Sequence, residues 1–281
     1  MEIKKAVITA AARDQRTLPL QTLVDRDGVQ RTALCILVEE VLKAGIEEIC
    51  VVVFPGDQAA YALAVGAHAD RLHFVEQAEP LGFAHAVACA SEFVKGEPFL
   101  LLVGDHLYVS GGQKGCAQQM VEIARLENCG VLAVQATHES KLPYYGTIGG
   151  RLEGTRPGLY RVETVIEKPT PTEAEQTLIV PGLRVGHYLC FFGMHVLTPV
   201  MMESLEEMRR EMRYLGGVQF AIALGRAVGR ERYLAFELSG RRYNIGARYG
   251  LLTAQLALAL EGQDRDEVLS GLIELLAIRP K

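Results

Sequence analysis

The chain has 281 residues, nearly half of them hydrophobic, and a formal net charge of −5 at pH 7. Such a composition is typical of a globular protein, and the acidic balance gives no electrostatic reason to expect a nucleic acid or an anionic membrane as partner. No apolar run approaches the about 20 residues of a membrane-spanning helix. Arg13 and Asp14 cut short the apolar run near the N-terminus, so we expect no signal peptide and a cytoplasmic protein.

The chain contains six cysteines, and no two of them form a Cys-x-x-Cys pair. Most lie among apolar neighbours, which favours buried free thiols over disulfides or zinc ligands. They are Cys35, Cys50, Cys89, Cys116, Cys129 and Cys190.

Short β-branched runs alternate with helical stretches over the first half of the chain. The expected strands cover residues 6–10, 48–54, 73–75, 99–103 and 130–135, and the expected helices cover residues 31–44, 58–67, 83–93 and 113–127. The strands are apolar on both faces, and the alternating order predicts a parallel sheet that is covered by helices.

The pattern changes after residue 140. We expect antiparallel strands over residues 146–152 and 159–167, further strands over 188–192 and 233–237, and helices over 199–212, 219–228, 249–261 and 266–276. No linker rich in Pro, Gly or Ser separates the halves, so we expect one mixed α/β domain whose more antiparallel second half forms a substrate lobe. We assign the leucines between Leu251 and Leu260 to core packing rather than to an interface.

The first strand runs into a loop at Ala11–Arg16, where α/β proteins commonly bind phosphate, yet this loop contains no glycine. Asp105 follows the buried strand over residues 99–103, and open α/β sheets place ligands at such carboxyl ends. A carboxylate there suits Mg²⁺, which combines protein carboxylates with phosphate oxygens. A helix cap or a turn is an equally good explanation of this aspartate.

Two other segments carry groups that suit a sugar nucleotide. Gln77 could hydrogen-bond a base edge, Gly82 lets the backbone approach a flat ring, and His85 could be a core or capping histidine. Glu167 could accept hydrogen bonds from sugar hydroxyls, and Lys168 could meet a phosphate. Taken alone, the first segment is more often an ordinary loop, and the second is often a solvated charge pair.

In their order along the chain, these segments resemble the sugar-1-phosphate nucleotidyltransferases, and among them the bacterial UTP–glucose-1-phosphate uridylyltransferases. The likeness covers nearly the whole chain. It rests on residues 4–8, 23–25, 38–41, 44–49, 77, 82, 85–87, 104–105, 145–146, 165–169, 240 and 244–246.

The resemblance implies a Rossmann-like, mostly parallel α/β fold, with residues 1–140 as the nucleotide-binding half, 141–248 as the sugar-binding half and 249–281 as C-terminal helices. It implies transfer of a nucleotidyl group, UMP from UTP, to a sugar-1-phosphate such as glucose-1-phosphate, with release of pyrophosphate. It also implies Mg²⁺ and a homo-oligomer. Such chemistry needs mainly positioning and charge neutralisation.

Site residues follow from the resemblance position by position. Arg16, Asp105 and Lys168 would be catalytic, with Arg16 on the triphosphate and Lys168 on the sugar phosphate. Asp105 and Asn244 would hold the metal. The nucleotide would contact Ala11, Ala12, Gln77 and Gly82, and the sugar would contact Tyr145, Gly146 and Glu167.

The chain departs from the family pattern on the phosphate and metal side. The family loop Gly-x-Gly-Thr-Arg is Ala12–Arg16 here, and the following Pro-Lys segment is missing, with Arg26 or Arg31 as possible substitutes in charge. Asn244 stands where the family has an aspartate, and residues 215–219 lack the family's two acids.

Two functions therefore stay open: an active nucleotidyltransferase, and a catalytically impaired homologue that binds a nucleotide or sugar nucleotide in a regulatory or partner role. A dinucleotide-binding Rossmann enzyme is disfavoured, because no Gly-x-Gly-x-x-Gly follows the first strand.

Overall fold

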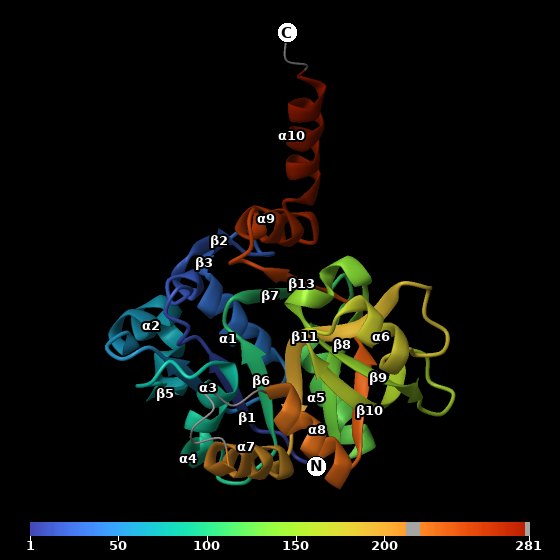
Figure 1. Cartoon of the computed structure of the whole chain (residues 1–281). Helices are drawn as coiled ribbons and strands as arrows, with labels where there is room; N and C mark the ends of the chain where they lie inside the picture. Colours follow the sequence, from blue (N-terminus) through green and yellow to red (C-terminus); the bar gives the residue numbers. More distant parts are fainter. Residues whose placement is uncertain (212–219, 279–281) are drawn as a thin grey trace.

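A mixed sheet of nine strands, in the order β5-β4-β1-β6-β11-β8-β12-β10-β9, forms the centre of the molecule (Figure 1). The computed structural model describes residues 1–211 and 220–278. One part of the sheet consists of four parallel strands: β1 (Lys5–Thr9), β4 (Glu48–Val53), β5 (Leu72–Glu76) and β6 (Phe99–Val103). The apolar runs of β1, β4 and β6 are almost wholly buried, as expected for parallel strands that are covered on both faces.

The other five strands pair into a closed ring, because β9 bonds both to β10 and to β11. These strands are β8 (Gly130–His138), β9 (Gly146–Leu152), β10 (Leu159–Glu167), β11 (His187–Leu197) and β12 (Tyr233–Glu237). In this ring β8 and β12 are parallel, while the other pairings are antiparallel. The expected mixed α/β fold with a more antiparallel second half is confirmed, and strands from both halves share one sheet.

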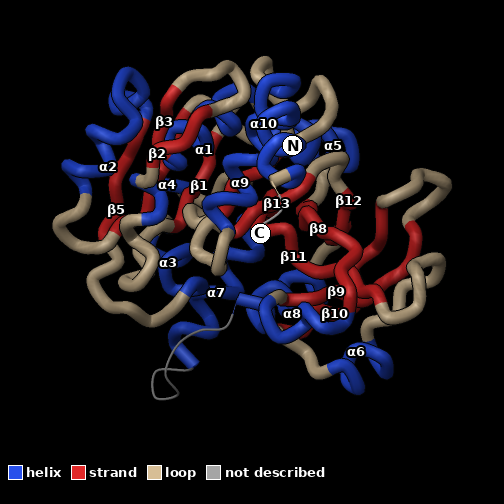
Figure 2. Tube along the Cα trace, turned by 90° about the horizontal axis from the view of Figure 1, so that it is seen from above, coloured by secondary structure: helices blue, strands red, loops and turns tan. Residues whose placement is uncertain are grey.

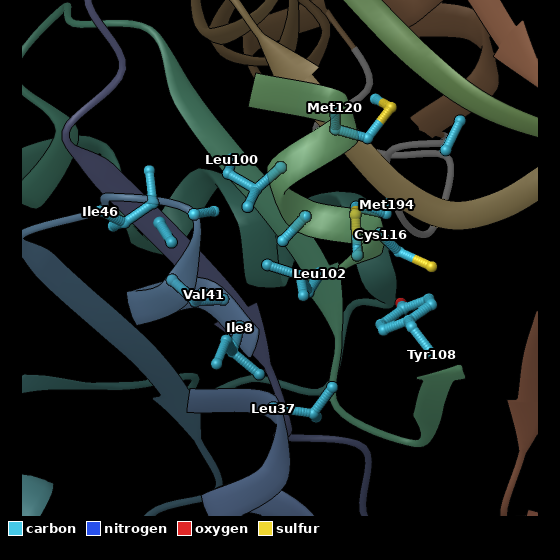
Figure 3. Close-up of a cluster of buried hydrophobic side chains, with 14 of the residues drawn as sticks. Ile8, Leu37, Val41, Ile46, Leu100, Leu102, Tyr108, Cys116, Met120 and Met194 are labelled. Carbon is cyan, nitrogen blue, oxygen red and sulfur yellow. The ribbon is translucent and has the colours of Figure 1, made fainter. Parts of the chain in front are cut away.

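Helices cover both faces of the sheet, and Figure 2 shows the two groups on opposite sides of the strands. One face packs against α1 (Ala33–Lys43) and α5 (Cys116–Glu127). Figure 3 shows Leu37 and Val41 of α1 with Met120 of α5 in this core. The other face packs against α3 (Phe83–Cys89), α7 (Pro199–Glu211) and α8 (Phe220–Arg230).

Several short elements lie outside these layers. Two short antiparallel pairs join β2 (Thr22–Val24) to β3 (Gln30–Thr32) and β7 (His106–Val109) to β13 (Arg241–Asn244). Each of these strands has only three or four residues, too few to show an alternating pattern. The remaining short elements are α2 (Gln58–Val65), α4 (Ser91–Val94), α6 (Pro171–Thr177), η1 (Leu18–Leu20), η2 (Gly66–Arg71) and η3 (Glu139–Tyr144).

The two C-terminal helices differ in how many of their side chains are buried against the rest of the protein. α9 (Gly250–Leu260) packs through Ala254 and Leu258, whereas Leu252 stays 56% exposed, so the assignment of the leucine stripe to the core is confirmed only in part. α10 (Arg265–Ala277) has no buried residue and projects from the body in Figure 1.

Most predicted element bounds agree with the structure, four of the strands to the residue. The expected helix over residues 83–93 is interrupted at Ala90, and the strand expected over residues 188–192 is longer, at His187–Leu197. The expected end of one helix at residue 212 and the expected start of the next at residue 219 lie outside the described residues. The same holds for segment 215–219, which departs from the family pattern. All six cysteines are free, and five of them are buried, as expected. No helix in residues 1–211 or 220–278 is long and apolar enough to cross a bilayer.

Truncation of a buried leucine should test the central packing. Leu101 of β6 is 0% exposed, whereas Leu63 of α2 is 83% exposed. We expect Leu101→Ala to lower the free energy of unfolding by about 2–5 kcal/mol, because it leaves a cavity between the sheet and the α7/α8 layer. Leu63→Ala should change it by less than about 0.5 kcal/mol. Urea titrations followed by circular dichroism measure both, and equal losses would contradict this packing.

Candidate functional site

Asp105 lies where β6 leaves the sheet, directly after Gly104. The Gly104 amide donates to the Thr9 carbonyl at 2.8 Å, and a Cβ on Gly104 would lie only 2.8 Å from that oxygen. Glycine therefore lets the ends of β1 and β6 approach this closely. The result places Asp105 beside the loop that follows β1, at the edge where parallel sheets bind ligands.

Pairing of β7 with β13 brings Asn244 to Asp105. Asn244 is opposite His106, and the Ile245 amide donates to the Asp105 carbonyl at 2.9 Å. The Asp105 carboxylate is 2.8 Å from Nδ1 of His106, and its side chain is 19% exposed. The two predicted metal residues are thus neighbours, and His106 is a partner of Asp105 that the sequence did not reveal.

The side-chain oxygens of Asp105 and Asn244 differ in how well they could bind a metal. Oδ1 of Asn244 accepts hydrogen bonds from the Gly246 and Ala247 amides at 2.8 and 3.1 Å, so it closes its own turn. The Asp105 carboxylate keeps free acceptor capacity, and it fits Mg²⁺ that is bound mainly through phosphate oxygens.

A second group of metal-type donors lies elsewhere in the structure. Cys35, Glu39 and His68 have donor atoms within 4.8 Å of one another, but the Arg31 guanidinium already lies on Glu39. We therefore consider Asp105 the better position for a divalent cation.

The glycine-free loop after β1 closes without left-handed backbone. No residue from Ala10 to Thr17 has a positive φ, and the Gln15 amide donates to the Ala12 carbonyl at 2.9 Å. The hydroxyl of Tyr61, which is fully buried, is 2.6 Å from the Arg16 carbonyl and 3.2 Å from the Ala10 carbonyl. Alanines thus form the turn that glycines form in the family, with Ala11 buried and Ala12 exposed.

Arg16 is already engaged by neighbours. Its guanidinium lies 4.8 Å from the Phe54 ring centre, and Nη1 is 3.4 Å from Oδ1 of Asp57. A triphosphate would have to compete with Asp57 for this cation. The loop also packs on the Asn244 turn, since a Cβ on Gly246 would lie 3.2 Å from Nε2 of Gln15.

The two arginines considered as substitutes for the missing lysine have structural partners. Arg31 bonds Asp25 at 2.5 Å and also pairs with Glu39. Nε of Arg26 donates to the Glu261 carbonyl at 3.0 Å, which ties the β2–β3 hairpin to the end of α9. Arg31 is therefore a paired cation, whereas Arg26 is held by a backbone carbonyl and forms no ion pair within residues 1–211 and 220–278.

The predicted base-binding residues form one compact unit. Nε2 of Gln77 donates to the Gly82 carbonyl at 3.0 Å and lies 3.0 Å from Nδ1 of His85. Because these contacts use the amide nitrogen, Oε1 is left to accept an N–H of a base. Gly82 has a φ of +93° and open space around its Cα, so it combines a backbone shape that favours glycine with room for a ring.

The predicted sugar residues meet where β9 and β10 pair. Glu167 is opposite Gly146, where a Cβ would lie 2.4 Å from the Phe191 ring and 3.0 Å from Oε2 of Glu167. Surrounding protein raises the pKa of Glu167 by desolvation, and the Lys168 charge opposes this shift. Lys168 has a left-handed φ of +48°, and its amide donates to the Tyr145 carbonyl at 3.2 Å.

Two chains of contacts link the base, metal and sugar residues. On one side, the Phe83 ring beside Gly82 packs on the Phe220 ring, with their ring centres 5.0 Å apart. Phe220 in turn contacts the ring of Phe191, which lies against Gly146. On the other side, Arg242 lies two residues before Asn244, and its guanidinium is 3.8 Å from the Tyr145 ring centre. The predicted residues are thus parts of one connected region. Phe191 and Arg242 were not identified from the sequence.

Comparison with known proteins matches this arrangement to one family. A model of the family described as nucleotidyl transferase matches residues 28–219. A UTP–glucose-1-phosphate uridylyltransferase of Streptococcus pneumoniae serotype 4 is 30% identical, over 98% of this chain and 96% of its own. The chain belongs to the nucleotidyl transferase family. A second family member, uridylyltransferase 1 of Streptococcus pyogenes serotype M3, is 29% identical over 97% of this chain and 94% of its own.

Solved structures share the fold of this nucleotidyl transferase family member. A UDP-glucose pyrophosphorylase complexed with UDP-glucose has a TM-score of 0.74 at 23% identity, covering 91% of this chain and 98% of its own. A UTP-bound UGPase from Acinetobacter baumannii has a TM-score of 0.75 at 22% identity, covering 99% of this chain and 100% of its own. The family resemblance and the fold class expected from the sequence are confirmed.

The left-handed backbone at Lys168 allows stability and ligand binding to be separated. We expect Lys168→Gly to have a free energy of unfolding about 1–2 kcal/mol higher than Lys168→Ala, because glycine adopts a positive φ without the Cβ clash. Both variants lack the ammonium and should lose equal affinity for a sugar phosphate. Thermal unfolding and calorimetric titration with glucose-1-phosphate measure the two effects. Equal stability of the two variants would contradict this backbone shape.

Proposed function

We propose that this protein is a UTP–glucose-1-phosphate uridylyltransferase. A phosphate oxygen of glucose-1-phosphate attacks the α-phosphorus of UTP, and a new P–O bond forms. The bond between the α-phosphorus and the oxygen that bridges to the β-phosphorus breaks, and pyrophosphate leaves with the electron pair. UDP-glucose is the other product, and the phosphates involved are anionic, so the step needs alignment and charge neutralisation more than acid–base catalysis.

Each part of the site has a role in this reaction. Gln77 and Gly82 bind the uracil, with Oε1 of Gln77 as acceptor for the ring N–H. Glu167 accepts hydrogen bonds from glucose hydroxyls beside Gly146, whose missing side chain lets the Phe191 ring pack there, and Lys168 holds the sugar phosphate. Asp105 holds Mg²⁺, which neutralises phosphate charge when bound.

The observation that carries the proposal is the spatial connection of three groups that the family uses together. The unit of Gln77 and Gly82, the Asp105 edge, and the pair of Gly146 and Glu167 are joined by contacts through Phe191 and Arg242. The relatives named for this reaction match nearly the whole chain, which supports the choice of UTP and glucose-1-phosphate.

A specific observation favours the second function, binding of a nucleotide sugar without efficient catalysis. The loop cation Arg16 already contacts Asp57, Oδ1 of Asn244 closes its own turn, and Arg26 and Arg31 have structural partners. Two of the cations considered for the phosphate side, Arg16 and Arg31, are therefore already paired with carboxylates.

Pyrophosphate release distinguishes the two functions. The protein is mixed with UTP, glucose-1-phosphate and Mg²⁺, and with a panel of other triphosphates and sugar phosphates. We expect release with the first pair, and a fall of about 100-fold or more in Asp105→Ala because charge stabilisation at the phosphates is lost. Asp266→Ala is the control, since that side chain is 95% exposed on α10, and it should behave as the wild type.

Absence of release from every pair, together with calorimetric binding of UDP-glucose, would overturn the enzyme and leave the binding protein. Absence of both release and binding would overturn the two functions together. Release that persists unchanged in Asp105→Ala would remove Asp105 from the catalytic role.

We also propose a cytoplasmic homo-oligomer, in keeping with six unpaired cysteines and with the surface of α10. Leu269, Ile273 and Leu276 lie three or four residues apart on α10 and are 38%, 59% and 82% exposed. Such spacing forms one apolar stripe, and α10 of a second copy carries an identical stripe that can cover it.

Light scattering after size-exclusion chromatography tests the oligomer. We expect the wild type to have a multiple of the 30.8 kDa chain mass, and Ile273→Glu/Leu276→Glu to run as a monomer because charges interrupt the stripe. Leu63→Glu, at an exposed position of α2, should leave the mass unchanged. A monomeric wild type, or an unchanged mass in the double variant, would contradict this assembly.

A further inference from the structure

Arg242 lies in the middle of β13, between the metal edge and the sugar residues. It is opposite Tyr108 of β7, and Asn244 is opposite His106 in the same pairing. Because side chains two residues apart leave the same face of a strand, Arg242 and Asn244 project to the same side. The strand pairing therefore places Arg242 near Asp105, although Arg242 was not among the site residues predicted from the sequence.

The charge of Arg242 has no counter-charge in the described part of the chain. Nη1 is buried and has no hydrogen-bond partner, and the guanidinium forms no ion pair with any residue among 1–211 and 220–278. Taking a charged group out of water is costly unless it is paired. An arginine in this situation indicates that an anion completes its surroundings.

The Tyr145 ring holds the guanidinium in place. The two are 3.8 Å apart, a distance typical of a stacked cation–π pair. This contact fixes the plane of the guanidinium and supplies some attraction, but it is not a negative charge. Because the Lys168 amide donates to the Tyr145 carbonyl, the arginine is positioned directly against the sugar-phosphate side of the site.

The titratable groups that share the field of Arg242 are neutral. Burial raises the pKa values of Tyr108 and Cys190, and it lowers the pKa of His195 to about 3. The Arg242 charge adds to the lowering at His195, and it opposes the rise in pKa at Tyr108 and Cys190. Asp105, which influences Tyr108 from the other side, already bonds His106. Tyr108, Cys190 and His195 therefore supply no counter-charge to Arg242.

We propose that Arg242 binds a phosphate oxygen of the nucleotide sugar and supplies positive charge that the shortened loop no longer provides. The assignment rests on the proposed function, since it names a further residue of the same site. Arg16 and Arg31 pair with carboxylates and Arg26 donates to a backbone carbonyl, whereas Nη1 of Arg242 has no hydrogen-bond partner among the described residues. A guanidinium also matches phosphate geometry better than an ammonium, because its planar donors bond two oxygens at once.

Calorimetric titration of wild type, Arg242→Gln, Arg242→Lys and Arg241→Gln tests the assignment. The probes are UDP-glucose and uridine, which lacks phosphate. We expect Arg242→Gln to weaken UDP-glucose binding about 10–100-fold, the range for a charge-assisted hydrogen bond, and to leave uridine binding unchanged. Arg242→Lys should recover part of the affinity because it keeps the charge. Arg241, the exposed neighbour on the other face of β13, provides the matched control.

Glucose-1-phosphate and inorganic pyrophosphate as separate probes show which phosphate is bound. A loss confined to glucose-1-phosphate assigns Arg242 to the sugar phosphate, and a loss confined to pyrophosphate assigns it to the leaving group. The first result supports the proposal, whereas the second overturns it, because the leaving pyrophosphate is not part of the nucleotide sugar.

Three other outcomes would overturn the proposal. Wild-type affinity of Arg242→Gln for UDP-glucose shows that the arginine binds no phosphate. Equal losses for uridine and UDP-glucose in Arg242→Gln and Arg242→Lys show a purely structural role. The wild type is titrated first. If it binds no UDP-glucose, the proposed function is overturned, and this assignment with it.

Discussion

The pairing of β7 with β13 is the constraint on which the site depends. Backbone hydrogen bonds between these short strands, extended by the Ile245 amide on the Asp105 carbonyl, return a C-terminal segment to the end of β6. Without this pairing Asn244 and Arg242 would have no fixed relation to Asp105. The β7 side is itself anchored in the core, since the Tyr108 hydroxyl donates to the Gly193 carbonyl at 2.5 Å.

The same pairing explains how the sugar side is joined to the metal edge. Arg242 stacks on Tyr145, and the carbonyl of Tyr145 receives the Lys168 amide. Lys168 is thereby held in a left-handed conformation that its own side chain disfavours. The surrounding contacts, rather than local preference, therefore determine the backbone conformation of Lys168.

Long apolar strands were predictable, because burial on both faces leaves a continuous hydrophobic run. β6 and β12 have the expected bounds for this reason. The short β7 and β13 were missed, since their pairing depends on residues far apart in the sequence. For the same reason, Arg242 and Phe191 gave no local signal, although both join predicted site residues in space. Asp105, Gln77 and Glu167 were found through the family resemblance, and spacing alone left simpler explanations open.

The loop after β1 shows how a family position can change while the turn remains. Successive turns without positive φ replace the glycines, and buried Tyr61 fixes the loop through the Arg16 carbonyl. The backbone path is thus kept by a side chain from α2. The arginine that the loop shares with the family, Arg16, faces Asp57, and the family's lysine is missing.

A crystal structure of the protein with UDP-glucose and Mg²⁺ is the most direct test of this arrangement. We expect the uracil against Gln77 and Gly82, the glucose against Glu167 above Gly146, and the diphosphate between them on the side of Asp105. An ordered nucleotide sugar whose uracil or glucose lies away from these residues would contradict the site described here, whatever the activity of the protein in solution.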